Sequence, residues 1–167
     1  MTVTKTLLQP GDRFPAVTIT RPGGQSLTVP DAFDGGYGVV LIYRGSWCRY
    51  CNAQLRGFQR AAEALSEVQA KVVALSTDPE PTTGELIAKH GLTFPVGHSV
   101  DAAAISAATG AFVDPTGGFL QSTGFVLDPT GQVVVGVYSS GAIGRLVPDD
   151  VVGLIRYLRA HAAASSA

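Results

Sequence analysis

Long hydrophobic runs, an excess of one charge and clustered metal ligands are all lacking in this sequence. No apolar run approaches the roughly 20 residues that a membrane span needs, and the first ten residues contain no apolar segment of the kind found in signal peptides. The formal net charge of −1 gives no reason to expect a nucleic acid or an anionic membrane as a partner. These absences predict a cytoplasmic protein that binds neither nucleic acid nor membrane.

Cysteine is scarce as well, and both cysteines stand in one C-x-x-C motif, at Cys48 and Cys51. A zinc site would need further ligands, but His90, His98 and His161 lack the spacing of a ligand pair. A structural disulfide would be kept reduced in the cytoplasm. Half of a zinc site and a pair of inert core thiols remain as alternatives, whereas the position of the motif favours redox chemistry. We therefore expect no metal and no cofactor.

The motif lies between a predicted strand and a predicted helix. The run 39–43 is short, apolar and rich in branched residues, which is typical of a strand buried on both faces. From Asn52 to about Glu67, apolar residues recur at helical spacing. A helix N-terminus offers unpaired N–H groups and a partial positive charge, which stabilise a thiolate. Two cysteines on its first turn can join as a disulfide and exchange with another thiol, so the pattern predicts a redox-active pair.

The other elements follow from alternation, buried runs and turn residues. We expect a hairpin at 16–29, a strand at 71–76, a helix from about Pro81 to His90, a short strand at 94–98, a helix from Asp101 to Gly110, an irregular loop at 111–122, a hairpin at 124–138 and a last helix from Pro148. This order predicts an α/β sandwich with a mixed sheet whose antiparallel strands come last. Nothing divides the chain in two, so we expect one domain over 1–167, with its core at about 8–160.

Four features of the sequence carry a resemblance to a known family. They are Trp-Cys-x-x-Cys at a strand–helix junction, the N-terminal hairpin, Phe94-Pro95-Val96 and the run 125–131. Over nearly its whole length the chain resembles the peroxiredoxin branch of the thioredoxin fold, the alkyl hydroperoxide reductase/thiol-specific antioxidant (AhpC/TSA) group. The resemblance implies a thioredoxin-like sandwich, with a mixed central sheet flanked by helices, and a thiol-dependent oxidoreductase. It also implies a peroxide or disulfide substrate and a thioredoxin-type dithiol reductant. Since the family often dimerises, a homodimer stays open.

The chain departs from the family at two places. Ordinary peroxiredoxins carry P-x-x-x-T-x-x-C, and distance from the strand puts Arg44 at the proline, Cys48 at the threonine and Cys51 at the attacking cysteine. The family also places an arginine just before the late hairpin strand, where thioredoxin-like proteins keep a cis-proline. This chain has Ser122-Thr123-Gly124 there. The missing arginine counts against efficient peroxide turnover.

Cys48 and Cys51 are the predicted catalytic residues. Exposure and the helix N-terminus favour attack by Cys48, whereas the spacing of the family favours Cys51. Either order leads to peroxide reduction through a Cys48–Cys51 dithiol–disulfide cycle. The alternatives are a thioredoxin-like thiol–disulfide exchanger and a non-enzymatic redox sensor that docks a partner through the loop 111–122.

Five neighbours are candidate supporting residues: Tyr43, Arg44, Trp47, Arg49 and Thr123. We expect Trp47 to shield the sulfur and to anchor the loop. Arg44 and Arg49 either steady a thiolate or are simply solvated. Tyr43 is a candidate donor to bound substrate, although packing explains it better. Thr123 is a candidate to approach the disulfide where the family keeps its cis-proline.

Overall fold

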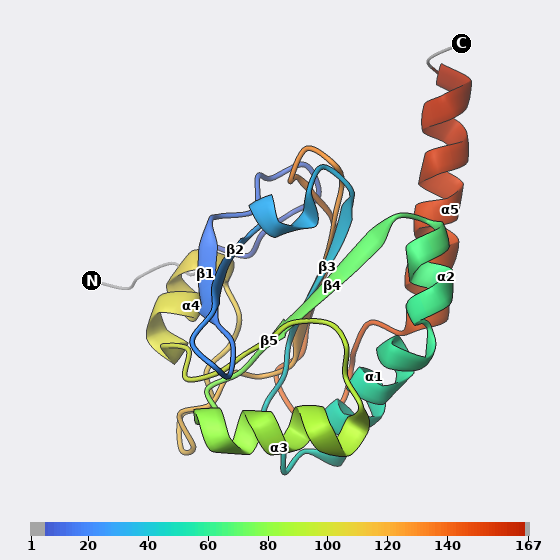
Figure 1. Cartoon of the computed structure of the whole chain (residues 1–167). Coiled ribbons are helices and arrows are strands. Elements are labelled where there is room, and N and C mark those ends of the chain that lie inside the picture. Colours follow the sequence, from blue (N-terminus) through green and yellow to red (C-terminus); the bar gives the residue numbers. More distant parts are fainter. Residues whose placement is uncertain (1–5, 166–167) are drawn as a thin grey trace.

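A five-stranded mixed sheet lies at the centre of the chain, whose computed structural model describes residues 6–165 and the side chains of residues 6–162. The strand order is β5-β4-β3-β6-β7 (Figure 1). The parallel strands are β3 (Tyr37–Ile42), β4 (Ala70–Leu75) and β5 (Val96–Gly97), and the antiparallel ones are β6 (Thr123–Leu127) and β7 (Val133–Tyr138). The predicted mixed sheet, with its antiparallel strands last, is confirmed.

Two apolar layers cover the sheet, one on each face. Every residue of β3 is buried, and its side chains alternate between the layers: Val39 and Leu41 enter one cluster, and Val40 and Ile42 enter the other. The first layer is made by α1 (Arg49–Arg60), α2 (Ala62–Glu67) and α5 (Pro148–Ser165). The second contains the hairpin of β1 (Val17–Thr20) and β2 (Ser26–Val29), the short helix η1 (Asp31–Phe33) and α4 (Ala102–Thr109). Figure 1 shows these layers on opposite sides of the strands.

The helix after the cysteines differs from the single segment that the sequence predicts. It begins earlier, at Arg49, with Cys48 as its N-cap, and it ends at Arg60. Ala61 leaves the helical conformation, with φ −88° and ψ 8°, and α2 starts directly after it. Leu55 and Leu65 nevertheless enter the same apolar cluster, so the break preserves the buried face that the periodicity indicates.

Helix ends elsewhere follow their capping residues. Asp101 accepts a hydrogen bond from the backbone N–H of Ala104 at 3.0 Å and so caps α4, while Gly110 closes it with φ +87°. The helix α3 (Glu80–His90) ends at Gly91, with φ +61°. Glycine adopts this left-handed conformation without steric cost, so the predicted stop is confirmed.

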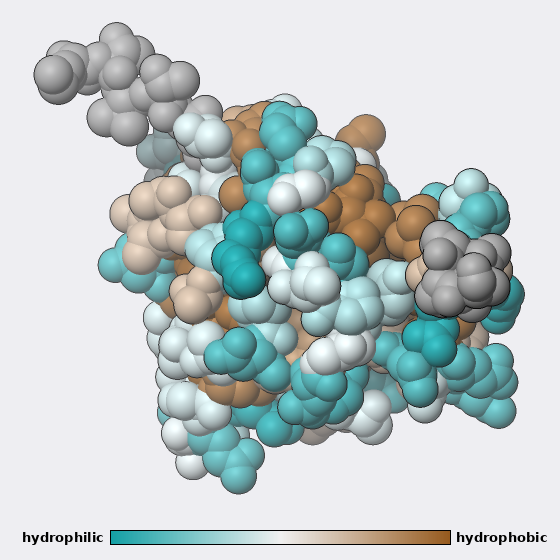
Figure 2. Space-filling view, turned by 90° about the horizontal axis from the view of Figure 1, so that it is seen from above, coloured by the Kyte–Doolittle hydropathy of each residue, from teal (hydrophilic) through white to brown (hydrophobic). Residues whose placement is uncertain are grey.

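The sheet has an open edge at β7, where Val134, Val135 and Val137 are only partly buried. Seen from above, most surface side chains are hydrophilic, with a hydrophobic area beside α5 (Figure 2). No helix among the described residues has both the length and the hydrophobicity that a membrane crossing needs.

Candidate active site

The two cysteines lie at the junction of β3 and α1, as the sequence predicts. Sγ of Cys48 accepts a hydrogen bond from the backbone N–H of Cys51 at 3.3 Å, which caps the helix. Sγ of Cys51 accepts one from the backbone N–H of Arg44, also at 3.3 Å. Both are free thiols, and both are buried, with 3% of Cys48 and none of Cys51 exposed. Cys48 is thus the outer sulfur by a small margin.

The guanidinium group of Arg145, which the sequence did not indicate, contacts both sulfurs. Nη2 of Arg145 lies 3.0 Å from Sγ of Cys51 and 3.4 Å from Sγ of Cys48. Arg145 comes from the segment between β7 and α5, far from the position before β6 where the family places its arginine. The site therefore has an arginine after all, supplied by a different segment.

Leu146 fixes the segment that carries Arg145. Its side chain is buried against Gly124 of β6, and its carbonyl accepts a hydrogen bond at 3.0 Å from Nε2 of Gln54 in α1. The segment is thereby tied both to the sheet and to the helix of the cysteines. A Cβ added at position 124 would come within 2.7 Å of Cδ1 of Leu146, so any larger residue there would force the Leu146 side chain to shift.

Arg44 approaches Cys48 from another direction. Its Nη1 lies 3.8 Å from Sγ of Cys48, and its Nε donates to Oε1 of Gln121 at 3.0 Å. The guanidinium carbon lies 4.9 Å from the ring centroid of Trp47 and 5.1 Å from that of Phe119. The two rings meet edge to face at 4.8 Å. Cation–π contacts and the Gln121 bond thus hold Arg44 beside the outer sulfur and tie the loop 111–122 to the site.

These contacts shift the pKa values of the two thiols in opposite directions. Burial alone would raise the pKa of Cys48, but the Cys51 thiol, the Cys51 N–H, Arg44 and Arg145 outweigh it, so this pKa lies below its usual value. Burial and the neighbouring Cys48 raise the pKa of Cys51, and the N–H of Arg44 and the guanidinium of Arg145 offset only part of that. Cys48 is therefore the thiol that loses its proton more readily.

Ser46 anchors the loop that leads to Cys48. Its N–H donates to Oδ2 of Asp78 at 2.8 Å, and its carbonyl accepts from Nδ2 of Asn52 at 2.9 Å. Asp78 follows β4 and is a buried residue. Burial raises the pKa of its carboxyl, although hydrogen bonds from the N–H and the side chain of Ser46 lower it. The end of β4 and the first turns of α1 thus clamp the cysteine loop from two sides.

The remaining candidate residues take structural places. Tyr43 is fully buried beneath the site, and burial raises its pKa to about 12. Trp47 is exposed and packs on Phe119 and Arg44. Arg49 is exposed, and its guanidinium lies over the ring of Tyr50. The hydroxyl of Thr123 donates to the carbonyl of Gln121 at 3.1 Å. Of the five supporting candidates, the structure brings only Arg44 into contact with a sulfur through its side chain.

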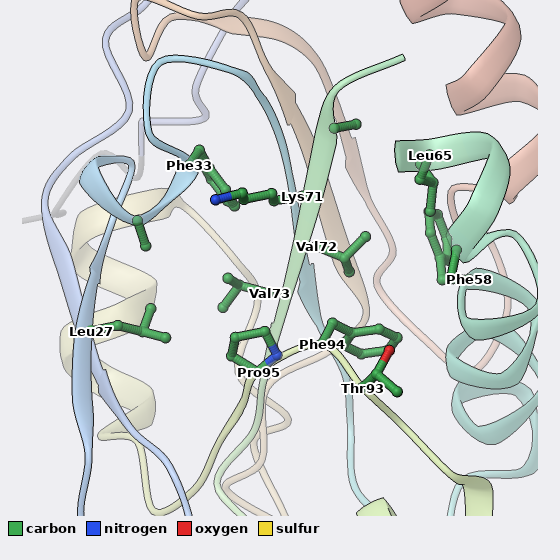
Figure 3. Close-up of a pocket in the computed structure, with 13 residues that line it drawn as sticks. Leu27, Phe33, Phe58, Leu65, Lys71, Val72, Val73, Thr93, Phe94 and Pro95 are labelled. Carbon is green, nitrogen blue, oxygen red and sulfur yellow. The ribbon is translucent and has the colours of Figure 1, made fainter. Parts of the chain in front are cut away.

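The apolar hollow of about 340 Å³ beside β4 is a different place. Its lining includes Leu27 and Phe33 on one side of the strand and Phe58 and Leu65 on the other (Figure 3). Neither cysteine lines it. Within the described residues, no group of three or more His, Cys, Asp or Glu side chains could hold a metal ion.

A thioredoxin-type sheet with two thiols at the start of a helix defines a thiol-dependent oxidoreductase. The sequence model of the AhpC/TSA family matches residues 10–135, and the chain belongs to that family. It is a peroxiredoxin-type protein, and both the predicted family and the predicted fold class are confirmed.

Solved structures agree with this fold. The chain is similar to the peroxidoxin BcpB from Mycobacterium tuberculosis, at 18% identity and a TM-score of 0.78, over 90% of this chain and 97% of that one. It is also similar to Mycobacterium tuberculosis AhpC, at 21% identity and a TM-score of 0.75, over 92% and 94% of the two chains. At such identities the likeness shows the fold alone. No curated protein matches the sequence.

Proposed function

We propose that this protein reduces peroxides through a dithiol–disulfide cycle of Cys48 and Cys51. The Cys48 thiolate attacks one oxygen of the peroxide, the O–O bond breaks, and the other oxygen leaves as an alcohol or water after taking up a proton. The resulting Cys48 sulfenic acid is attacked by Cys51, which releases water and forms the disulfide. An external thioredoxin-type dithiol then supplies two electrons and two protons to restore both thiols.

The contact of Arg145 with both sulfurs carries this proposal. A guanidinium next to the attacking sulfur stabilises the thiolate and can also hold the negative charge that develops on the leaving oxygen. A simple exchanger needs a stabilised thiolate only. The arginine whose absence counted against peroxide turnover is supplied at the site by the segment before α5.

Cys48 is the proposed first nucleophile. It is the outer sulfur, its Sγ accepts the N–H of Cys51, and its pKa is lowered, whereas the pKa of Cys51 is raised. A thiol with a raised pKa competes little for the peroxide, and Cys51 can give its proton to the departing hydroxide of the sulfenic acid as it attacks Cys48. The spacing of the family favours the opposite order, so the assignment needs a direct test.

Dimedone trapping provides that test. Peroxide and dimedone are added to the Cys48→Ser and Cys51→Ser variants, and the adduct is located by mass spectrometry. We expect a sulfenic acid on Cys48 in the Cys51→Ser variant. A stable adduct on Cys51 alone would reverse the roles. Loss of NADPH absorbance with thioredoxin, thioredoxin reductase and hydrogen peroxide then measures turnover in the wild-type protein.

Thiol–disulfide exchange is the second candidate, favoured by the position of Cys48 as the N-cap of α1 with Cys51 one turn later. Reduction of insulin disulfides without peroxide would support it. A reversible Cys48–Cys51 bond with no turnover in either assay would instead indicate a redox sensor.

Three further parts of the proposal concern the protein as a whole. We infer that residues 1–167 act as one domain, with the core at about 8–160, and that the protein works in the cytoplasm, where dithiol reductants are available.

The partly buried valines along the open edge of β7 make that edge the proposed contact of a homodimer. Sedimentation of wild type and of Val135→Lys would test the homodimer.

A further inference from the structure

The large hydrophobic side chains that the described part of the chain leaves exposed are few and unevenly placed. They are Trp47, Tyr50, Ile143, Val147 and Tyr157, each between 47% and 68% exposed. The first four belong to two segments that meet at the cysteines, and Tyr157 lies in the middle of α5. Single exposed apolar residues are ordinary, but a group around one site marks a surface for binding.

Arg145 joins the two segments. Ile143 and Val147 stand two residues before and after it, and its Nη2 contacts both sulfurs. Its guanidinium carbon also lies 5.9 Å from the ring centroid of Tyr50, which is two residues from Cys48. Trp47, Tyr50 and Ile143 therefore form an apolar rim beside the sulfurs, whereas Val147 lines a hollow with Gly57 further along α1.

A peroxide does not need this rim. The sulfurs lie below it, almost wholly buried, and a small molecule that reaches them contacts Arg44, Arg145 and the thiolate. A protein that must bring its own sulfur to Cys48 has to rest on whatever surrounds the opening. The proposed cycle requires such a partner at its last step.

The charged side chains near the two cysteines favour one kind of partner. Arg44 and Arg145 lie beside the sulfurs, and Arg49 is exposed next to Tyr50. Asp149 borders the hollow that Val147 lines with Gly57 and Arg60, away from the rim. The face closest to the sulfurs is thus apolar and positive.

We propose that the rim of Trp47, Tyr50 and Ile143 is the docking face for the protein dithiol that reduces the enzyme, and that this partner has an apolar surface with carboxylates around its cysteine. The inference rests on the proposed dithiol–disulfide cycle. The partner thiolate attacks Sγ of Cys48, the Cys48–Cys51 bond breaks, and Cys51 leaves with the electron pair. The second partner thiol then gives its proton to Cys51 and attacks the mixed disulfide, which releases the Cys48 thiolate and a partner disulfide.

The test compares two reductants on one disulfide. The Cys48–Cys51 bond is formed with diamide, so that the experiment does not depend on peroxide turnover, and is then reduced with thioredoxin or with dithiothreitol. Quenched-flow alkylation with mass spectrometry follows the rate. In the Ile143→Ser variant we expect the rate with thioredoxin to fall by about ten-fold, because central apolar contacts carry most of an interface's energy. The rate with dithiothreitol should stay unchanged. Tyr157→Ser is the matched control and should leave both rates unchanged.

Salt provides a second readout. Raising the ionic strength to about 0.5 M should slow thioredoxin much more than dithiothreitol, whose one reacting thiolate brings no surface charges of its own, since exposed charges are screened. Equal loss with both reductants would show that the segment had merely been damaged and would overturn the proposal. An unchanged rate with thioredoxin would also overturn it. A sedimentation coefficient that differs between the variant and the wild type would likewise overturn it, because the rim would then be assigned to contact with a second copy of the chain. Failure of peroxide, but not diamide, to form the disulfide would refute the peroxidase function alone.

Discussion

Nη2 of Arg145 lies 3.0 Å from Sγ of Cys51, although 94 residues separate the two in the sequence. The same nitrogen lies 3.4 Å from Sγ of Cys48, so one guanidinium contacts the proposed nucleophile and its resolving partner together. A positive charge shared in this way favours whichever sulfur carries the negative charge at each step of the cycle. The functional predictions below start from this contact.

Replacement of Arg145 should slow peroxide reduction more than it disturbs the fold. A hydrogen bond to a charged group contributes about 1.5–3 kcal/mol, so Arg145→Ala should lower the rate of oxidation by hydrogen peroxide by about ten- to hundred-fold. Stopped-flow fluorescence of Trp47, the only tryptophan, measures this rate. Arg49→Ala is the control, because Arg49 is exposed and its guanidinium lies over Tyr50. Equal rates in wild type and Arg145→Ala would contradict the assigned role.

The pH dependence of alkylation should distinguish the two cysteines. Because the pKa of Cys48 is lowered and that of Cys51 is raised, Cys48 should become reactive at lower pH than a free peptide thiol and Cys51 at higher pH. The midpoint of each profile reports the pKa even where burial slows the reaction. Cys51→Ala removes the thiol that donates to Cys48 and should move the Cys48 midpoint upward. A single common midpoint for both thiols would be incompatible with this assignment.

Asp78 should affect both the cysteine loop and the pH dependence of stability. Asp78→Ala removes the acceptor of the Ser46 N–H and should cost about 1–3 kcal/mol, because a buried donor is left unpaired. Asp78→Asn keeps an acceptor oxygen and should retain more of the reactivity of Cys48. Urea unfolding, together with the alkylation rate, measures both effects.

The sign of the pH effect follows from the raised pKa of Asp78. A carboxyl with a raised folded-state pKa contributes stability below its unfolded pKa, and this contribution is lost as the pH rises through the folded value. Asp78→Asn does not titrate. The free energy of unfolding of the wild type should therefore fall relative to that of Asp78→Asn as the pH rises through this range. A constant difference would show that Asp78 titrates normally.

Tyr43→Phe should leave both stability and activity nearly unchanged. The hydroxyl of Tyr43 is buried and has no hydrogen-bond partner of full geometry, although Ser76 and Thr83 lie nearby. Removal of an unpaired buried polar group relieves a desolvation cost, so the melting temperature should be equal or higher. An ultraviolet titration should lose one tyrosine that ionises only near pH 12. A large loss of peroxidase activity would instead identify Tyr43 as a donor to substrate.

The fold was predictable because its elements carry local signals. Gly91 and Gly110 end helices where the left-handed conformation is needed, and Asp101 offers an oxygen to the N–H of Ala104. The all-buried strand before Cys48 showed as a continuous apolar run. The break at Ala61 carried no such signal, because the buried face continues across it.

The site was predictable only as far as the two cysteines and Arg44. Arg145 lies in a segment without periodicity or motif, and its place beside the sulfurs depends on Leu146 packing against β6. Asp78 likewise reaches Ser46 only because β3 and β4 are neighbours in the sheet. Conversely, Arg49 stands next to Cys48 in the sequence, yet its guanidinium lies over Tyr50. Adjacency along the chain was therefore a poor guide to which arginine contacts a sulfur.

Because Leu146 packs closely on Gly124, substitutions at positions 124 and 145 are expected to depend on each other. A side chain at 124 would force Leu146 to shift, and an outward shift of its backbone would carry Arg145 away from the sulfurs. A descendant that acquires such a residue must recruit its positive charge from another segment or lose the chemistry. Positions 124 and 145 are therefore expected to change together among relatives that keep this arrangement, and the glycine is as much a signature of the mechanism as the arginine.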